Sequence, residues 1–268
     1  MNTFTKLARF PALGLIVLGL IALALSSFSN NPVQSQEPDE LEFEILQQLP
    51  HSDNNFTQGL FFYEGSLYES TGHYGQSKLI RYKTDFHSEL MARTVAPKYF
   101  AEGATEHNGT IYQLTWQAET ALAYNPSRLS QEEGFTYEGE GWGLTSDGDV
   151  LWLSNGSDLL NKLDTDGEIL ASINVTFNGA PLNLLNELEW INGNIFANRW
   201  YDNHVYVIDP ETGRVTAHLD LQEIAAPELV LSAEHVLNGI AWNTETETLW
   251  VTGKNWQYLY ELKLSEND

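Results

Sequence analysis

Five short stretches of the sequence carry one repeated pattern: Gln58-Gly59-Leu60, Glu102-Gly103-Ala104, Trp142-Gly143-Leu144, Asn186-Glu187-Leu188 and Asn238-Gly239-Ile240. In the first four, an aliphatic–aromatic pair ends nine residues after the middle position, and in the fifth the pair ends two residues later than that. The middle positions (59, 103, 143, 187 and 239) are separated by 44, 40, 44 and 52 residues. Because a four-stranded propeller blade takes about 40–50 residues, this spacing predicts an all-β fold, a five-bladed β-propeller.

Turn-forming dipeptides separate the short β-rich runs of the chain. They are Glu64-Gly65, Asn108-Gly109, Asp147-Gly148, Asp166-Gly167, Asn192-Gly193 and Thr212-Gly213. Short runs of strand-forming residues with such punctuation predict β-hairpins. Residues 41–49 are expected to supply the outer strand of the last blade, which closes the ring, and residues 221–231 are expected to form a helical segment.

The composition excludes several classes of function. The 268 residues include 13 Lys and Arg against 37 Asp and Glu, which gives a formal net charge of −24, and there is no cysteine. Such an acidic surface repels phosphate backbones, so we expect no nucleic-acid partner. The lack of cysteine excludes disulfides, thiol catalysis and thiolate zinc sites.

Residues 1–36 differ from the rest of the chain. Lys6 and Arg9 precede an apolar stretch of 16 residues that ends at residue 25, and a polar run rich in Ser, Asn and Gln follows. This order is typical of a secretory signal peptide or an N-terminal membrane anchor with a polar linker. Because a membrane span needs about 20 residues, the short stretch favours cleavage. We therefore expect an exported protein, periplasmic or secreted, whose residues 37–268 form the propeller.

The residue before each repeat's middle position should face the central axis, since the inner strand of every blade lines the channel. These residues are Gln58, Glu102, Trp142, Asn186 and Asn238. One interpretation is a ring of polar groups that satisfy one another around a wet channel. Glu102, however, is the ionisable member and lies between Phe100 and Ala104. A carboxyl group in such apolar surroundings should have a raised pKa and exchange protons near neutrality.

A second set of residues lies just after the aromatic pairs, where strands should end. It comprises Trp116, Trp200 and the run Lys254-Asn255-Trp256. Tryptophan in a β-protein most often packs in the core, but strand ends next to Gly or polar residues are expected at a rim. A tryptophan cage with one carboxylate and one lysine would suit a small amine or amide.

Nine stretches of the chain match the motifs of a known family. The matching stretches are Phe56-Thr57-Gln58-Gly59-Leu60, Glu69-Ser70-Thr71-Gly72, Glu102-Gly103, Gln113-Leu114-Thr115-Trp116, Gly141-Trp142-Gly143-Leu144, Leu185-Asn186-Glu187-Leu188-Glu189, Asn198-Arg199-Trp200, Leu237-Asn238-Gly239-Ile240-Ala241-Trp242 and Val251-Thr252-Gly253-Lys254. On these motifs the chain resembles the plant and bacterial, papaya-type glutaminyl-peptide cyclotransferases, or glutaminyl cyclases. The resemblance implies a five-bladed propeller that converts the N-terminal glutamine of peptides and proteins to pyroglutamate and releases ammonia.

The resemblance also implies roles for individual residues. The family's catalytic carboxylate falls on Glu102, which would act first as general base and then as general acid. Its neighbours fall on Phe56, Gln58, Phe100, Trp116, Trp142, Asn186, Trp200 and Lys254. Gln58, Asn186, Lys254 and the tryptophan indole N–H groups are candidate donors to the oxyanion. Arg199, where the family usually has a small apolar residue, is expected to alter the charge of the rim.

Two other functions stay open at the level of sequence. A metal-dependent, lactonase-like propeller hydrolase would use Glu102, Asn186 and Asn238 as oxygen ligands of Ca²⁺. A non-catalytic peptide-binding propeller would hold its ligand in the tryptophan cage, and Glu102 would be dispensable. The seven histidines lack zinc-site spacing, and we expect each of them to be satisfied at the surface.

For the cyclotransferase we expect a monomer that needs no cofactor. The sequence leaves open whether a structural divalent ion is bound in the channel. Asn238 is expected to contact substrate because of its axial position. The only expected membrane contact is through the N-terminal segment.

Overall fold

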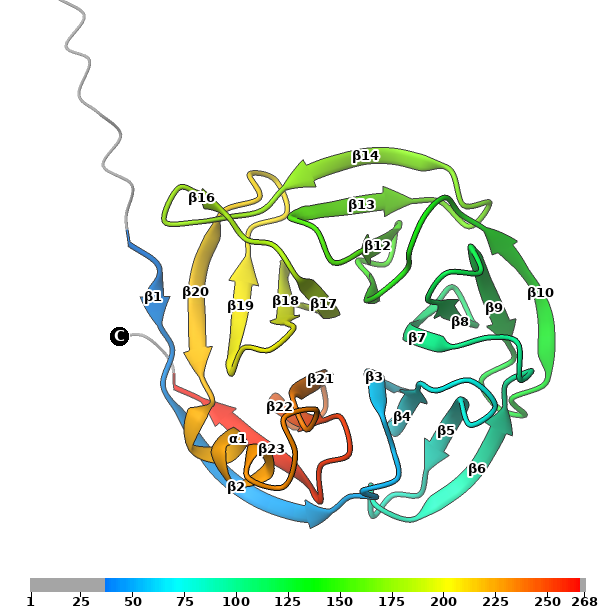
Figure 1. The fold of residues 1–268 in the computed structure, drawn as a ribbon, viewed down its shortest axis with the longest axis horizontal. Coiled ribbons are helices and arrows are strands. Elements are labelled where there is room, and N and C mark those ends of the chain that lie inside the picture. The colour runs from blue at the N-terminus through cyan, green and yellow to red at the C-terminus, as the bar shows by residue number, and fades with distance from the viewer. Residues whose placement is uncertain (1–36, 266–268) are drawn as a thin grey trace, which may run out of the picture. The chain divides into compact units, whose positions relative to one another are not determined.

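The computed structural model describes residues 37–265, which form a ring of five β-sheets around a central axis (Figure 1). Each sheet is a blade with four antiparallel strands, and in blades 1 to 4 the chain order of these strands runs outward from the axis. The predicted five-bladed β-propeller is therefore confirmed.

The blades contain the following strands, each given from the axis outward. Blade 1 has β3 (Thr57–Tyr63), β4 (Ser66–Thr71), β5 (Lys78–Tyr82) and β6 (Glu89–Thr94). Blade 2 has β7 (Ala101–His107), β8 (Thr110–Thr115), β9 (Thr120–Tyr124) and β10 (Gln131–Thr136). Blade 3 has β11 (Leu144–Ser146), β12 (Leu151–Ser154), β13 (Leu159–Leu163) and β14 (Ile169–Asn174).

The last two blades depart slightly from this scheme. Blade 4 has β17 (Leu185–Ile191), β18 (Asn194–Arg199), β19 (His204–Ile208) and β20 (Val215–Asp220), with β1 (Asp39–Glu40) added in parallel at its edge. Blade 5 has β21 (Leu237–Asn243), β22 (Thr248–Gly253), β23 (Tyr258–Leu264) and β2 (Phe43–Pro50). The short hairpin of β15 (Thr176–Phe177) and β16 (Ala180–Pro181) lies between blades 3 and 4 in the chain.

The two ends of the described chain meet in blade 5 and close the ring. β2 pairs antiparallel with β23, from Phe43 opposite Leu264 to Pro50 opposite Tyr258 (Figure 1). This confirms the outer strand predicted at residues 41–49. The parallel strand β1 was not predicted, because two residues are too few to show a periodicity.

The six predicted turn dipeptides all connect consecutive strands of one blade. In three of them both residues have positive φ angles: Glu64-Gly65 (47° and 68°), Asn108-Gly109 (52° and 83°) and Asn192-Gly193 (48° and 86°). This is the geometry of a type I′ turn, whose twist matches that of the two flanking strands. The dipeptides therefore fix where each hairpin reverses.

The repeated motif marks a β-bulge in the innermost strands. The pairing of the first two strands shifts register at the motif in four blades: between Thr57 and Gly59, Ala101 and Ala104, Leu185 and Leu188, and Leu237 and Ile240. In blade 3, β11 begins only after the motif. A bulge re-aims the side chain beside it, and here it falls where the blades converge.

Neighbouring inner strands approach so closely at the motif that glycine is required there. A Cβ atom on Gly103 would lie 2.6 Å from the backbone nitrogen of Leu144, and one on Gly143 would lie 1.9 Å from the carbonyl oxygen of Asn186. Blade 4 has Glu187 instead, whose carboxylate accepts hydrogen bonds from the backbone N–H groups of Leu60 (3.3 Å) and Ile240 (2.9 Å). Glu187 thus joins the inner strands of blades 1, 4 and 5.

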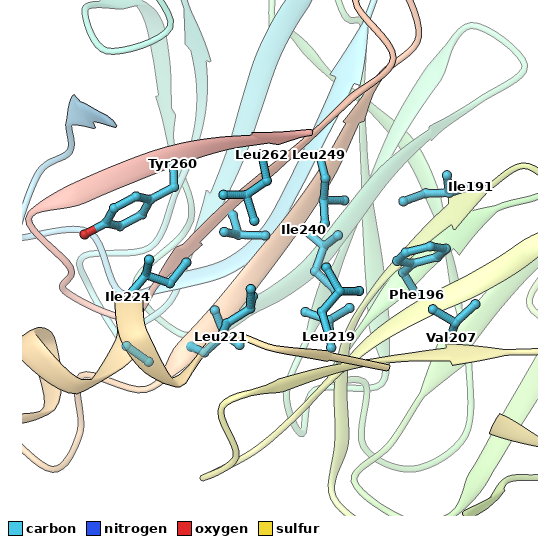
Figure 2. Packing of buried hydrophobic residues seen from close by; sticks show 14 of the residues in the cluster. Ile191, Phe196, Val207, Leu219, Leu221, Ile224, Ile240, Leu249, Tyr260 and Leu262 are labelled. Carbon is cyan, nitrogen blue, oxygen red and sulfur yellow. The ribbon is translucent and has the colours of Figure 1, made fainter. Parts of the chain in front are cut away.

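Apolar side chains pack between adjacent blades, and Figure 2 shows the cluster shared by blades 4 and 5. Leu221 and Ile224, at the start of helix α1 (Gln222–Leu229), are buried in it. Each such side chain contributes about 1.5–3 kcal/mol when fully buried. The helix confirms the segment predicted at 221–231 and accounts for the long 52-residue step. No helix within residues 37–265 has the length and apolar character to cross a bilayer.

Candidate active site

One cavity of about 220 Å³ collects nine of the ten predicted site residues. Its lining consists of Phe56, Gln58, His73, Phe100, Glu102, Trp116, Trp142, Asn186, Trp200 and Lys254. These residues lie at the beginning of first strands or at the end of second strands. Because those two strands are antiparallel, both positions lie at the same end of every blade, where the five blades meet.

Three of the polar lining residues come from the bulges of the inner strands. Gln58, Glu102 and Asn186 face the cavity yet are only 3%, 5% and 2% exposed. The Oδ1 atom of Asn186 is buried and has no hydrogen-bond partner among the described residues. An unpaired buried amide oxygen is costly, so this atom is available to a bound polar ligand.

Asn238 does not line the cavity, which corrects its predicted role as a substrate contact. It is fully buried, and its Nδ2 atom donates to the carbonyl oxygen of Thr57 (2.9 Å) and to Oε1 of Gln58 (3.3 Å). The amide of Asn238 is thus engaged with the neighbouring blade. It orients Gln58, the residue that does reach the cavity.

Five aromatic side chains form the walls. Phe100 packs edge-to-face on Phe56 (6.2 Å between ring centres) and at 65° on Trp116 (5.9 Å). Trp142 packs edge-to-face on Trp200 at 5.6 Å. Such contacts make aromatic walls rigid. Trp256, part of the second predicted set, lies instead in the core and donates its indole N–H to the carbonyl oxygen of His235.

Glu140 holds two of these walls and was not predicted. Its Oε2 atom accepts hydrogen bonds from the indole Nε1 atoms of both Trp116 (2.8 Å) and Trp142 (3.0 Å), while its Oε1 atom accepts one from Gln117 (2.9 Å). These two indole N–H groups are therefore not free to bind an oxyanion, which corrects that prediction. The signal in the sequence was an acidic residue directly before Gly141-Trp142.

His73 is the other lining residue that the sequence did not indicate. Its ring centre lies 4.2 Å from that of Phe56 and 5.5 Å from that of Phe100. His73 follows the matched stretch Glu69-Ser70-Thr71-Gly72 and has a positive φ of 84°. Burial and the charge of Lys254 lower its pKa. His73 is exposed, as expected for the histidines, and it also lines the cavity, whereas His107 is buried, which contradicts that expectation.

Glu102 and Lys254 set the electrostatics of the cavity. Burial raises the pKa of Glu102 well above its usual value, Lys254 opposes this rise, and the charge of Glu140 adds to it. Burial lowers the pKa of Lys254 to about 8, although Glu102 and Glu234 act in the opposite direction. The ammonium group also lies over the rings of Phe56 (4.8 Å) and Trp200 (5.7 Å). Lys254 can thus change protonation near neutral pH, and Glu102 holds its proton more strongly than an exposed carboxyl group does.

Known proteins share this sequence and this architecture. The family model described as glutamine cyclotransferase matches residues 19–264. The chain is 33% identical over 237 residues to the glutaminyl-peptide cyclotransferase of Arabidopsis thaliana, covering 84% of this chain and 72% of that protein. The crystal structure of Myxococcus xanthus glutaminyl cyclase matches with a TM-score of 0.81 and 34% identity, covering 87% of this chain and 100% of that one. The chain belongs to the glutamine cyclotransferase family.

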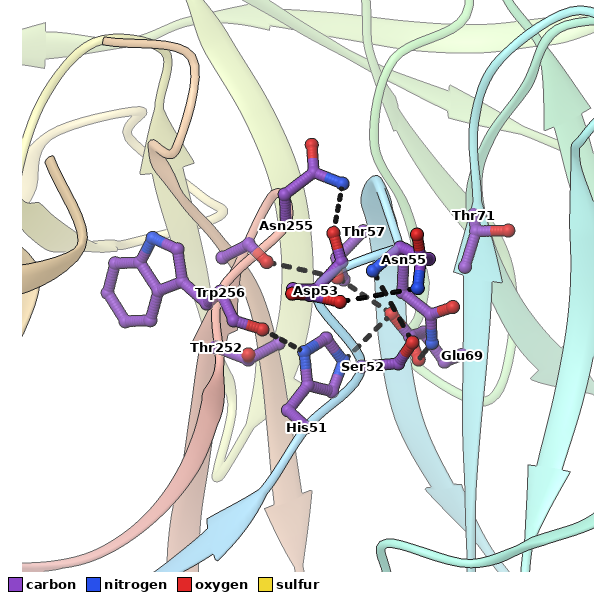
Figure 3. Close-up of polar contacts among 12 residues, drawn as sticks. His51, Ser52, Asp53, Asn55, Thr57, Glu69, Thr71, Thr252, Asn255 and Trp256 are labelled. Carbon is purple, nitrogen blue, oxygen red and sulfur yellow. Dashed lines mark hydrogen bonds and ion pairs between the residues drawn. The ribbon is translucent and has the colours of Figure 1, made fainter. Parts of the chain in front are cut away.

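In this member of the cyclotransferase family, a buried polar network surrounds Glu69 (Figure 3). Glu69 is fully buried and accepts hydrogen bonds from Asn55 (2.8 Å), Thr57 (2.7 Å) and Tyr82. The Nε2 atom of His51 lies 3.2 Å from its Oε1 atom. Since Thr57 precedes Gln58, this network fixes the strand that carries one wall of the cavity.

The same network reaches Lys254. The hydroxyl group of Thr57 also contacts the carbonyl oxygen of Gly253 at 3.2 Å, and the Nδ1 atom of His51 lies 2.8 Å from the carbonyl oxygen of Trp256. His51 follows the closing strand β2. Ring closure and the position of Lys254 therefore depend on one cluster of hydrogen bonds.

Arg199 does not act as a free charge at the rim of this cyclotransferase-family site. Its Nη1 atom forms an ion pair with Oδ2 of Asp202 at 2.9 Å, and its Nε atom donates to the carbonyl oxygen of Asn183 at 3.0 Å. The carboxylate cancels the added positive charge. The expectation that Arg199 alters the rim charge is therefore wrong.

Proposed function

We propose that this chain is a glutaminyl-peptide cyclotransferase in which Glu102 carries both proton transfers. Its substrates are peptides and proteins with an N-terminal glutamine, which it converts to pyroglutamate with release of ammonia. The observation that carries the proposal is the setting of Glu102. It is the only carboxyl group among the ten lining residues, it is buried, and it shares an aromatic-walled cavity with one lysine.

The cavity suits one amino-acid side chain better than a large ligand. Its volume of about 220 Å³ is below the roughly 300–1,000 Å³ of pockets for drug-sized molecules. The aromatic walls hold the aliphatic part of the glutamine and fold it back toward its own amine. Because the attack is intramolecular, such positioning supplies a large part of the rate enhancement.

The proton transfers balance with a single carboxyl group. The free α-amine attacks the side-chain amide carbon, and a C–N bond forms while the carbonyl oxygen becomes an oxyanion. The Glu102 carboxylate takes the proton that the amine nitrogen must lose, and then donates it to the leaving NH₂ group. The old C–N bond breaks, ammonia departs, and Glu102 is again a carboxylate, ready for the next substrate.

Three cavity residues are available to stabilise the oxyanion. Lys254 brings a positive charge, and Gln58 and Asn186 bring side-chain amides. Removing one donor of this kind typically lowers kcat by about 10²–10³. Lys254 has a second role, since its charge favours the carboxylate form of Glu102 that the first step requires.

We propose that the reaction needs no metal ion. The alternative Ca²⁺ ligand set requires Glu102, Asn186 and Asn238 to converge, but Asn238 does not line the cavity that Glu102 and Asn186 share. Within residues 37–265, no group of three or more His, Asp or Glu side chains is placed to hold a metal ion.

The proposal is tested by ammonia release from a glutamine-initiated dipeptide, for the parent protein and Glu102→Gln, with and without EDTA. We expect chelator-resistant turnover in the parent and a loss of about 10²–10⁴ in the variant. Equal turnover in the two proteins would contradict the role of Glu102. A parent that binds the dipeptide without turnover would favour a binding propeller, and EDTA-sensitive lactone hydrolysis would favour the metal-dependent hydrolase.

We also propose that residues 1–36 direct export and that the protein acts outside the cytoplasm. This segment lies outside the described residues, and its order of charged, apolar and polar residues supports the proposal. N-terminal sequencing of the protein recovered from its host is the test. A periplasmic or secreted chain that has lost the apolar stretch ending at residue 25 is the expected result, whereas an intact cytoplasmic chain would contradict it.

A further inference from the structure

We propose that Glu140 is a positioning residue for the cyclisation: its carboxylate aligns Trp116 and Trp142 as walls of the cavity, and its negative charge acts on Glu102. The proposal rests on the proton-carrier role of Glu102 given above. Glu140 itself is not among the residues that line the cavity.

The geometry around Glu140 joins two blades. Trp116 follows the second strand of blade 2, and Trp142 precedes the first strand of blade 3. The Oε2 atom of Glu140 accepts hydrogen bonds from both indole N–H groups, at 2.8 and 3.0 Å. Next to it, the backbone N–H of Gly141 donates to the carbonyl oxygen of Trp116 at 3.1 Å. Side chain and backbone therefore hold the same two residues together.

A carboxylate suits this position for a physical reason. A half-buried indole N–H needs a hydrogen-bond partner, and a bond to an ionised acceptor is about twice as strong as one between neutral groups. Two donors on one oxygen also fix the relative orientation of the two rings. Since Trp142 packs edge-to-face on Trp200, a third wall depends on the same carboxylate.

Glu140 keeps its negative charge at the pH at which Glu102 binds a proton. Although burial raises the pKa of Glu140, hydrogen bonds from Gln117, Trp142 and Trp116 outweigh it and hold that pKa below its usual value. The resulting negative charge disfavours the ionised form of Glu102, against the opposing effect of Lys254. The charge of Glu102 adds to the rise that burial gives the pKa of Tyr137, Lys254 adds to the lowering of the pKa of His73, and Glu234 opposes the lowering of the pKa of Lys254.

Two substitutions separate the geometric effect from the charge effect. Glu140→Ala removes the acceptor of both indole N–H groups and the charge together. Glu140→Gln removes the charge but keeps one oxygen, which can still accept hydrogen bonds from both indole N–H groups. The new NH₂ group then faces Gln117, whose side-chain amide can turn so that its oxygen accepts a hydrogen bond from that group. The matched control is Glu138→Gln, which removes an exposed negative charge two residues away in the same connection.

The experiment measures kcat, KM and the pH dependence of kcat for ammonia release from a glutamine-initiated dipeptide. We expect Glu140→Ala to lower kcat/KM by roughly 10- to 100-fold, as misplaced binding groups do. Glu140→Gln should keep most of the activity, and its acidic limb should move to lower pH, because Glu102 loses a neighbouring negative charge. Glu138→Gln should leave kcat/KM and the position of the acidic limb unchanged.

Several results would overturn the proposal. One is a Glu140→Ala variant within twofold of the parent, and another is an acidic limb that does not move in Glu140→Gln or moves equally in Glu138→Gln. Thermal unfolding of each variant shows whether it folds, and Glu140→Gln keeps the test valid if Glu140→Ala does not. An inactive parent, or a fully active Glu102→Gln, would instead contradict the proposed function and its mechanism.

Discussion

Two buried carboxyl groups, Glu102 in the cavity and Glu69 in the polar network, have pKa values that move in opposite directions. Their side chains belong to residues that are 5% and 0% exposed, so burial alone does not distinguish them. Burial raises the pKa of Glu102 well above its usual value. In Glu69 the same effect is outweighed by His51 and by hydrogen bonds from His51, Tyr82 and Thr57, and its pKa is lowered.

The difference lies in what each carboxyl group meets inside the protein. Glu69 is surrounded by side-chain donors that favour its ionised form, so it stays charged and holds strands together. Glu102 faces a cavity and one lysine, so burial outweighs the charge of Lys254 and favours the protonated form. For these two carboxyl groups, the side-chain donors around them decide the direction in which the pKa moves.

The largest expected effect tests the Glu102 side of this comparison. Glu102→Gln should lower kcat by about 10²–10⁴ and leave the free energy of unfolding unchanged or higher, because an amide is cheaper to bury than a carboxyl group with one partner. Kinetics and urea unfolding of the same preparation measure both quantities. A variant that is inactive because it has lost several kcal/mol of stability would remove the distinction between the two sites.

Glu69→Gln should show the reverse pattern. It places an NH₂ group among donors and leaves His51 without its charged partner, so we expect a loss of about 3–5 kcal/mol in the free energy of unfolding. Activity per folded molecule should fall far less than in Glu102→Gln. Urea unfolding measures the loss, with Glu44→Gln on the exposed side of β2 as the control. Unchanged stability would mean that the network does not hold the ring closure.

The smallest expected effect is a change in the pH profile of kcat. Activity should rise with pH as Glu102 loses its proton, and should fall above about pH 8 as Lys254 loses the charge that favours the carboxylate and the oxyanion. Lys254→Arg keeps its charge at every accessible pH, so its alkaline limb should move to higher pH. An alkaline limb that is the same in the variant and the parent would assign that limb to another group.

The ring and most of the cavity could be predicted from the amino-acid sequence alone. The five motifs recur at a spacing that fits one blade each, and in blades 2 and 3 their glycines allow neighbouring strands to approach closely, so the sequence predicted five blades. The same motif lies on the inner strand of each blade, next to the central axis of the propeller. Its positions therefore also predicted that Gln58, Glu102, Trp142 and Asn186 converge. Those features depend on local geometry repeated along the chain, which a single sequence records.

The hydrogen-bond partner of each polar group could not be predicted from the sequence and depends on how the blades pack. The amide of Asn238 binds Gln58 of the next blade, Glu140 takes the indole N–H groups of two blades, and Asp202 neutralises Arg199. A hydrogen bond depends on side-chain directions to within an ångström, and repeat spacing fixes the blades but not these directions. The sequence thus indicated where the carboxyl group of the site lies, and the packing of the blades decided that it is Glu102, and not Glu69, that can exchange a proton.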